Sequence, residues 1–256
     1  MPKAAATTQT RRQPRGSARP PQAGARWQQG FSIIGHRGAA GLVAENTLPS
    51  FRRAVELGVA AIELDIYWHD GELLIIHDDT LNRTTNGRGQ LTRRSITELR
   101  QLDAGAGAQI PLLAEVFASV PAQVAINLEL KGPACAAPVA AALALWLPPH
   151  DVLVSSFDHA QLRDFRAVNT STPVAPLFHR SAQNMLEVGA ELGACAINLS
   201  SRIATASRLA AIRDAGFGAV VYTVNSLRSA RRLARDGATG VFTDRPDRIT
   251  QAAIAK

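Results

Sequence analysis

The sequence predicts a single α/β domain, a (β/α)8 TIM barrel with an insertion after its second strand. From residue 31 onward, eight short apolar runs alternate with longer amphipathic segments, as strands alternate with helices in such a barrel. The runs carry few charges before their last residues, which is typical of parallel strands covered by helices. An open doubly wound sheet is the alternative. It is disfavoured because no Gly-rich phosphate loop of the expected form follows the first run.

The apolar runs and the amphipathic segments define the predicted strands and helices. The strands are expected at 31–35, 59–66, 123–130, 151–155, 173–177, 195–199, 219–224 and 239–243. The first helix, 47–57, is opened by the capping pair Asn46-Thr47 and closed by Gly58. Further helices are expected to begin in "LLAE" at 112–115, to lie near 135–146, 159–167, 181–191, 203–214 and 226–235, and to follow Pro246.

Residues 67–111 interrupt this alternation, because they are far longer than a βα loop of about 2–6 residues. Within them, "HDG" followed by "ELLIIHD" predicts a hairpin, and "SITELRQLD" predicts a short helix capped by Ser95 with Glu98 three residues later. In a barrel this insertion follows the end of the second strand, at the face where active sites form.

Residues 1–30 are predicted to be a basic, disordered tail. They contain six Lys or Arg residues and no Asp or Glu, so they carry +6 of the net charge of +7. The nearly neutral remainder, residues 31–256, lacks the strong positive charge that is typical of nucleic-acid-binding domains, and no nucleic-acid partner is expected.

No apolar run approaches the ~20 residues of a transmembrane helix. Without a secretory signal the expected location is the cytoplasm, and Cys135 and Cys195 are expected to be buried thiols rather than a disulfide. The oligomeric state stays open.

Carboxylates collect at the ends of two predicted strands. Glu63 and Asp65 in "AIELDI" are two residues apart and therefore point to one face, and Glu129 and Lys131 in "INLELK" repeat that spacing. A divalent cation with oxygen ligands, such as Mg²⁺ or Ca²⁺, would offset the cost of burying three carboxylates. An internal salt-bridge cluster with Lys131 and Arg37 explains the spacing equally well.

Two histidines also stand at the ends of apolar runs: His36, before Arg37 in "GHRGAA", and His77 in "LLIIHDD". A strand exit in which the polar pair meets water is the simpler interpretation of "GHRG". Together with the carboxylates and cations, however, two imidazoles suit phosphodiester cleavage. Cations neutralise the phosphate oxygens, one imidazole removes a proton, and the other protonates the departing alkoxide.

Longer motifs carry a resemblance to a known family. They are "GHRGAAGLVAENTLPSF", "AIELDIYWHDGELLIIHDDTLNRTTNGRG", "INLELK", "VSSFD", "VYTVN" and "GVFTDRP". In this order and spacing, from about residue 33 to 247, the chain resembles the glycerophosphodiester phosphodiesterase family. The resemblance implies a TIM barrel in which 67–111 is the family's insertion. It also implies hydrolysis of small-molecule glycerophosphodiesters to glycerol 3-phosphate and an alcohol, with a divalent cation, Mg²⁺ or Ca²⁺.

The resemblance also implies roles for individual residues. His36 and His77 match the general acid–base pair. The metal ligands are matched by Glu63, Asp65 and Glu129, and the phosphate-binding cations by Arg37 and Lys131. Family members are thought to let the substrate's own glycerol hydroxyl attack phosphorus, giving a cyclic phosphate that water opens. The chain has Tyr222 where the family often has tryptophan, and Phe157 is either the facing wall for glycerol or a core residue. Glu45 and Asn46 are candidates for supporting positions, although helix capping also explains Asn46.

Two other functions are compatible with parts of the sequence. A lysophospholipase D-type reaction would keep the chemistry and change the substrate, and "YW" at 67–68 is the hint of an apolar ledge for a lipid. A non-catalytic protein that binds nucleic acid or an anionic membrane through its basic tail is the other alternative. The intact set of site residues argues against it.

Overall fold

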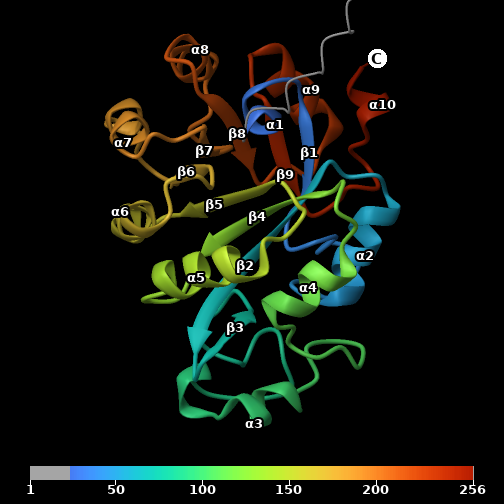
Figure 1. Cartoon of the computed structure of the whole chain (residues 1–256). Coiled ribbons are helices and arrows are strands. Elements are labelled where there is room, and N and C mark those ends of the chain that lie inside the picture. Colours follow the sequence, from blue (N-terminus) through green and yellow to red (C-terminus); the bar gives the residue numbers. More distant parts are fainter. Residues whose placement is uncertain (1–23, 256) are drawn as a thin grey trace, which may run out of the picture.

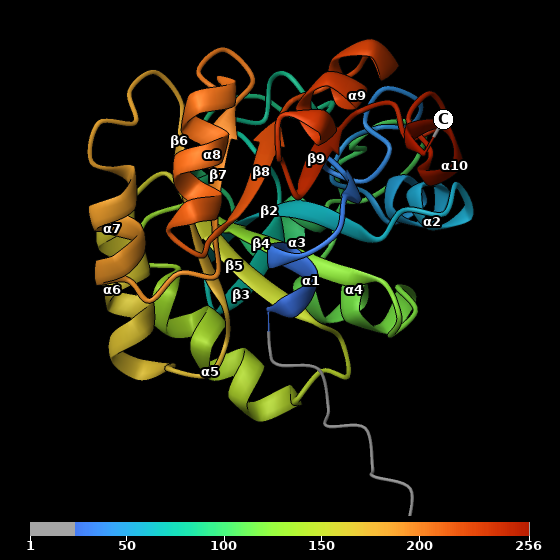
Figure 2. The ribbon, with the colours of Figure 1, turned by 90° about the horizontal axis from the view of Figure 1, so that it is seen from above.

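Eight parallel strands close into a barrel in the computed structural model, which describes residues 24–255 (Figures 1 and 2). The strands are β1 (Ser32–Gly35), β2 (Ala61–His69), β4 (Ala125–Leu130), β5 (Val152–Ser156), β6 (Val174–Phe178), β7 (Ala196–Ser200), β8 (Gly218–Tyr222) and β9 (Gly240–Thr243). β1 closes the barrel because it pairs with β2 on one side and β9 on the other, both parallel. The predicted TIM barrel is therefore confirmed, and each predicted strand forms within a few residues of its expected bounds.

The helices lie on the outside of the strands (Figure 2). They are α2 (Leu48–Glu56), α4 (Leu113–Ser119), α5 (Ala136–Trp146), α6 (His159–Val168), α7 (Met185–Glu191), α8 (Ala206–Asp214), α9 (Leu227–Arg235) and α10 (Gln251–Ile254). α8 begins later than the predicted residue 203 because the Thr205 side chain caps it, accepting a hydrogen bond from the Arg208 amide at 3.3 Å. α7 likewise begins at 185 rather than 181.

The insertion forms the predicted hairpin and helix. β3 (Glu72–Ile75) runs antiparallel to the end of β2, and Asp70 and Gly71 between them both have positive φ, as a two-residue hairpin turn requires. A 3-10 turn, η1 (Leu91–Arg93), precedes α3 (Ile96–Arg100), which has the predicted capping box of Ser95 and Glu98. In Figure 1 the insertion projects from one side of the barrel. It has a small core of its own: Tyr67, Leu74, Ile76, Leu81, Leu91, Leu99, Ala104 and Ile110.

The N-terminal end of the barrel is closed by a short helix that the sequence did not predict, α1 (Ala25–Gln28). Trp27 on this helix is fully buried and packs with inward-facing residues of the strands, among them Ile34 and Phe242. Gly218 permits the close approach, since a Cβ there would lie 1.9 Å from the Trp27 carbonyl oxygen.

The predicted disordered tail therefore extends too far, because residues 24–30 are part of the barrel. Burial of the Trp27 indole outweighs the polar composition around it, since a tryptophan buries roughly 150–250 Å². Residues 1–23 lie outside the described residues, so the rest of the tail stays a prediction. Within the described chain both cysteines are free and buried, as expected. No helix there combines the length and the apolar character needed to cross a bilayer.

Candidate active site

A cavity of about 350 Å³ opens at the carboxyl ends of the strands. It brings together eight of the nine residues singled out in the sequence: His36, Arg37, Glu63, His77, Glu129, Lys131, Phe157 and Tyr222. The ninth, Asp65, lies beside the cavity, where one of its carboxylate oxygens is within 4.8 Å of oxygens of Glu63 and Glu129. The cavity is also lined by residues that were not among these nine, including His179, Ser200 and Arg202.

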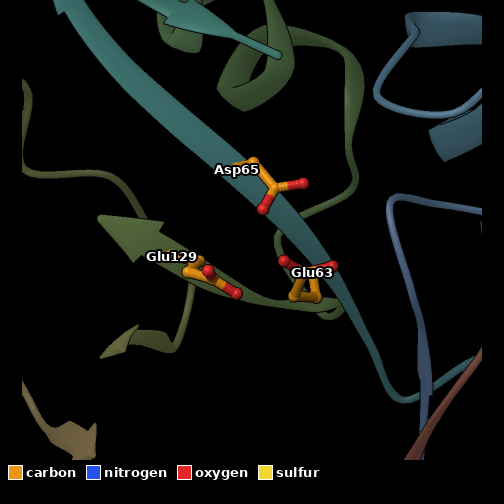
Figure 3. Close-up of side chains that lie close together, drawn as sticks. All are labelled: Glu63, Asp65 and Glu129. Atoms are coloured by element: carbon orange, nitrogen blue, oxygen red, sulfur yellow. The ribbon is translucent and has the colours of Figure 1, made fainter. Parts of the chain in front are cut away.

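The three carboxylates form a buried cluster. Glu63 and Asp65 project from β2 and Glu129 from the neighbouring β4, and their side chains face one another (Figure 3). The pairing of β2 with β4 sets Asp65 opposite Glu129, which explains why residues far apart in the sequence meet here. All three are less than a tenth exposed. The spacing of two along each strand therefore has the consequence expected from the sequence.

Burial makes this cluster costly without a cation. Burial first, and then the negative charge of Asp65, raise the pKa of Glu129 to about 7. The same two causes, with Glu129 in addition, raise the pKa of Glu63 well above its usual value.

The donor set fits a hard divalent cation. Glu63 Oε1 is buried and has no hydrogen-bond partner among the described residues, so a coordinating oxygen is free. All the available donors are carboxylate oxygens, which Mg²⁺ and Ca²⁺ prefer. The ion pairs of the alternative interpretation also exist, from Lys131 Nζ to Glu129 Oε1 at 3.1 Å and from Arg37 Nε to Asp65 Oδ2 at 3.2 Å. They leave Glu63 Oε1 unpartnered.

Arg37 is held in place by its backbone and its side chain. Its φ of 51° turns the chain at the end of β1, and its amide donates to Glu63 Oε2 at 2.9 Å. Its guanidinium Nη1 donates to Glu45 Oε1 at 2.8 Å. Burial lowers the pKa of Arg37, but the neighbouring carboxylates, Asp65 first, raise it by more, so the cation is retained.

His36 is oriented by a carboxylate from the last strand of the barrel. Its Nδ1 lies 2.6 Å from Asp244 Oδ1, and its Nε2 lies 4.0 Å from Glu63 Oε2. Asp244 is fixed in turn by Asn225, whose Nδ2 donates to Asp244 Oδ2 at 2.6 Å. Burial opposes ionisation of Asp244, yet the hydrogen bond with His36 and the further partners lower its pKa overall.

His77 has a similar partner next to it in the sequence. Its Nδ1 lies 2.5 Å from Asp78 Oδ1. When Nδ1–H donates to this carboxylate, the neutral imidazole presents Nε2 as its proton acceptor. Burial is the largest influence on His77 and lowers its pKa, which favours the neutral form. Asp78 and Asp244 are functional candidates that the sequence reasoning missed. The available signals were the acid after the histidine in "IIHDD" and the acid after the strand in "GVFTDRP".

The aromatic pair forms one wall of the cavity. The rings of Phe157 and Tyr222 have centroids 5.7 Å apart and meet at 87°, and the Tyr222 hydroxyl donates to the Phe178 carbonyl at 2.9 Å. Phe157 is 42% exposed, so it lines the cavity and is not a core phenylalanine. Asn46 does not cap α2, because Thr47 does so. The Asn46 side chain instead donates from Nδ2 to Asp65 Oδ2 at 2.8 Å.

Known proteins are similar to this chain over most of its length. Residues 36–248 match the glycerophosphoryl diester phosphodiesterase family. A glycerophosphodiester phosphodiesterase of Caldanaerobacter subterraneus is 29% identical over 231 residues, which cover 85% of this chain and 95% of that protein. One of Bacillus altitudinis is 32% identical over 238 residues, 86% of this chain and 96% of that protein. The structure of an Oleispira antarctica phosphodiesterase in complex with the product sn-glycerol-3-phosphate is similar, with a TM-score of 0.82 and 28% identity over 88% of this chain and 97% of that one.

Proposed function

Because the chain belongs to the glycerophosphoryl diester phosphodiesterase family, we propose that it hydrolyses glycerophosphodiesters to sn-glycerol 3-phosphate and an alcohol. The family is one of phosphoric diester hydrolases, so the chain is an enzyme of that class. The observation that carries the proposal is that one cavity brings His36 and His77 together with Arg37, Lys131 and a buried cluster of carboxylates.

The cations of the cavity would bind the phosphate. Arg37 and Lys131 line it, and both already pair with carboxylates that a bound cation would neutralise. Glu63, Asp65 and Glu129 would hold a divalent cation, Mg²⁺ or Ca²⁺, which when bound supplies further positive charge to the phosphate oxygens. Three carboxylates serve either ion.

The two histidines would move the protons. One of His36 and His77 would accept the proton of the attacking hydroxyl, and the other would donate a proton to the departing alkoxide. The attacking group would be the substrate's own glycerol hydroxyl, and water would open the resulting cyclic phosphate. No protein nucleophile is then needed. Consistent with this, Ser200 and Ser201 line the cavity but hydrogen-bond to no imidazole among the described residues.

Product release tests the proposal directly. Purified protein supplied with Mg²⁺ or Ca²⁺ should release sn-glycerol 3-phosphate from glycerophosphocholine, glycerophosphoethanolamine or glycerophosphoglycerol. His36→Ala and His77→Ala should each lower kcat by about 10²- to 10⁴-fold, because each removes one proton carrier. His159→Ala is the matched control, since His159 bonds the Leu177 carbonyl and does not line the cavity. Wild-type turnover in both active-site variants would exclude the mechanism.

A lysophospholipase D-type reaction is the second candidate. It is favoured by Trp68, which is 37% exposed at the end of β2, although its neighbour Tyr67 is buried in the insertion. Turnover of lysophosphatidylcholine compared with glycerophosphocholine separates the two functions. Removing residues 1–23 should leave either activity unchanged, whereas lost activity would support a binding role for the tail. The cytoplasmic location stays a prediction.

A further inference from the structure

Arg83, in the insertion between β3 and η1, makes ion pairs with two carboxylates from different parts of the chain. Its Nε donates to Asp78 Oδ2 at 2.6 Å, and its Nη2 donates to Asp78 Oδ1 at 2.9 Å. Its Nη1 and Nη2 also donate to Glu45 Oε2 and Oε1, at 2.8 and 2.9 Å. Asp78 belongs to the insertion, whereas Glu45 belongs to the loop between β1 and α2. One guanidinium therefore ties the insertion to the barrel at the edge of the cavity.

Each of these carboxylates holds a residue of the proposed site. Asp78 contacts His77 Nδ1, and Glu45 accepts a hydrogen bond from Arg37. We propose that Arg83 is a positioning residue that sets the proton carrier His77, borne by the insertion, relative to the phosphate-binding Arg37, borne by the barrel. The inference rests on the proposed function, because it assumes those two roles.

The chemistry of the contacts requires arginine. A guanidinium is a planar fork that can satisfy two carboxylates at once, whereas a lysine ammonium is a single point of charge. The hydrogen bond from Arg83 is the largest influence on Asp78 and lowers its pKa, so Asp78 stays an acceptor for His77. Burial opposes ionisation of Glu45, but hydrogen bonds from Arg83 and then the charge of Arg37 lower its pKa overall.

A purely structural role fits the observations less well. The Arg83 side chain is 47% exposed, and ion pairs at such exposed positions contribute little to stability. The insertion has its own apolar core, and Gly105 packs against Ala44 as a second contact with the β1–α2 loop. Loss of Arg83 should therefore leave the insertion folded but less well placed. Displacements of about 1 Å can cost on the order of 10²-fold in rate.

The test compares Arg83→Gln with Arg88→Gln, which replaces another exposed arginine of the insertion. Arg88 makes no ion pair with a described residue, so its replacement should change kcat/KM by less than about twofold. We expect Arg83→Gln to lower kcat/KM for glycerophosphoglycerol by about 10²-fold. Arg83→Lys should recover only part of the loss, because it can serve one carboxylate.

Double variants distinguish positioning from general damage. Asp78→Asn should act mainly on kcat, through His77, and Glu45→Gln mainly on the Kd of sn-glycerol 3-phosphate, measured by titration calorimetry, through Arg37. Arg83→Gln combined with either should cost much less than the product of the two single losses, since the partners act as one unit. Independent, multiplicative losses, or an Arg83→Gln variant equal to Arg88→Gln, would overturn the proposal. If the wild type turns over no glycerophosphodiester, the proposed function fails. The Kd of inorganic phosphate in the same variants still tests whether Arg83 places Arg37.

Discussion

At the scale of single residues, each imidazole of the proposed acid–base pair, His36 and His77, is oriented by a carboxylate on its Nδ1. Asp244 holds His36 from the opposite end of the sequence, and Asp78 holds His77 from the next position. The carboxylate selects the tautomer and the ring orientation, so that the other ring nitrogen is available for proton transfer. Proton transfer in the site should therefore depend on residues that need not touch the substrate.

Asp244→Asn tests this dependence for His36. Asp244 accepts from both His36 and Asn225, and an asparagine amide can offer only one oxygen to those two donors. One hydrogen bond is therefore lost and the imidazole is misplaced, so we expect kcat to fall by about 10²-fold. Steady-state kinetics with glycerophosphoglycerol measure the effect. Asp247→Asn is the control, because Asp247 pairs with Arg245 outside the cavity. Equal turnover in the two variants would contradict the role of Asp244.

At the scale of elements, α1 shows how a short segment can matter beyond its length. The helix is only four residues long, but Trp27 fills the N-terminal end of the barrel, opposite the cavity. Its Gly24 packs against Pro173 and Cys195, which fixes the entry of the chain. The barrel thus begins before its first strand.

Trp27→Ala should destabilise the protein strongly. Truncating a buried tryptophan costs about 3–5 kcal/mol in the free energy of unfolding, from lost burial and the cavity left behind. For a chain of this size the loss corresponds to a fall in Tm of roughly 10 °C. A thermal melt followed by circular dichroism measures it, with deletion of residues 1–23 as the control that should leave Tm unchanged. A Trp27→Ala variant that melts with the wild type would show that α1 is dispensable.

Most of the elements could be predicted from the sequence because their signals are local. Apolar runs and capping residues such as Thr47 and Ser95 act within a few positions of where they stand. α1 could not be predicted, since four residues have no hydrophobic period and the packing of Trp27 depends on strands far along the chain. Period alone also misplaced the starts of α7 and α8.

At the scale of the whole molecule, the site residues that could be predicted have local signals in the sequence, whereas the others depend on contacts between distant parts of the chain. The predicted residues lie within or directly after apolar strands, and parallel strands place such residues on one side of the barrel, so a local pattern was sufficient to bring them to one cavity. Asp244 meets His36 only because β9 pairs with β1 when the barrel closes, 208 positions along the chain. The partners of Arg83 likewise depend on how the insertion settles on the barrel.

The charge of the whole site also follows from the arrangement of the strands, since the pairing of β2 with β4 brings three acids together away from water. Without a cation, the pKa of Glu129 is about 7 in the folded protein, compared with the usual 4.5. The folded state therefore binds a proton at Glu129 more tightly than the unfolded state does. Protonation of Glu129 therefore stabilises the folded state relative to the unfolded state. This contribution is fully present below about pH 4.5 and is lost as the pH rises through about 7. A bound cation would reverse this dependence, because it requires the ionised carboxylate.

Thermal melts of the wild type and Glu129→Gln in EDTA, at pH 6 and pH 8, test this linkage. Between these values the wild type should lose about 1.4 kcal/mol relative to the variant, because only the wild type must ionise a group whose pKa is near 7. The lost free energy corresponds to roughly 3–6 °C in Tm. Comparison with Glu129→Gln cancels the titration of groups that do not depend on Glu129, including His77, whose lowered pKa acts in the opposite direction. The substitution also removes the contribution of Glu129 to the raised pKa of Glu63, which adds to the difference in the same direction. Added Mg²⁺ or Ca²⁺ should raise the Tm of the wild type more at pH 8 than at pH 6, and raise that of the variant less. If the Tm values of the two proteins instead change equally with pH and respond equally to the cation, then the pKa of Glu129 is not raised by its surroundings and Glu129 is not a ligand.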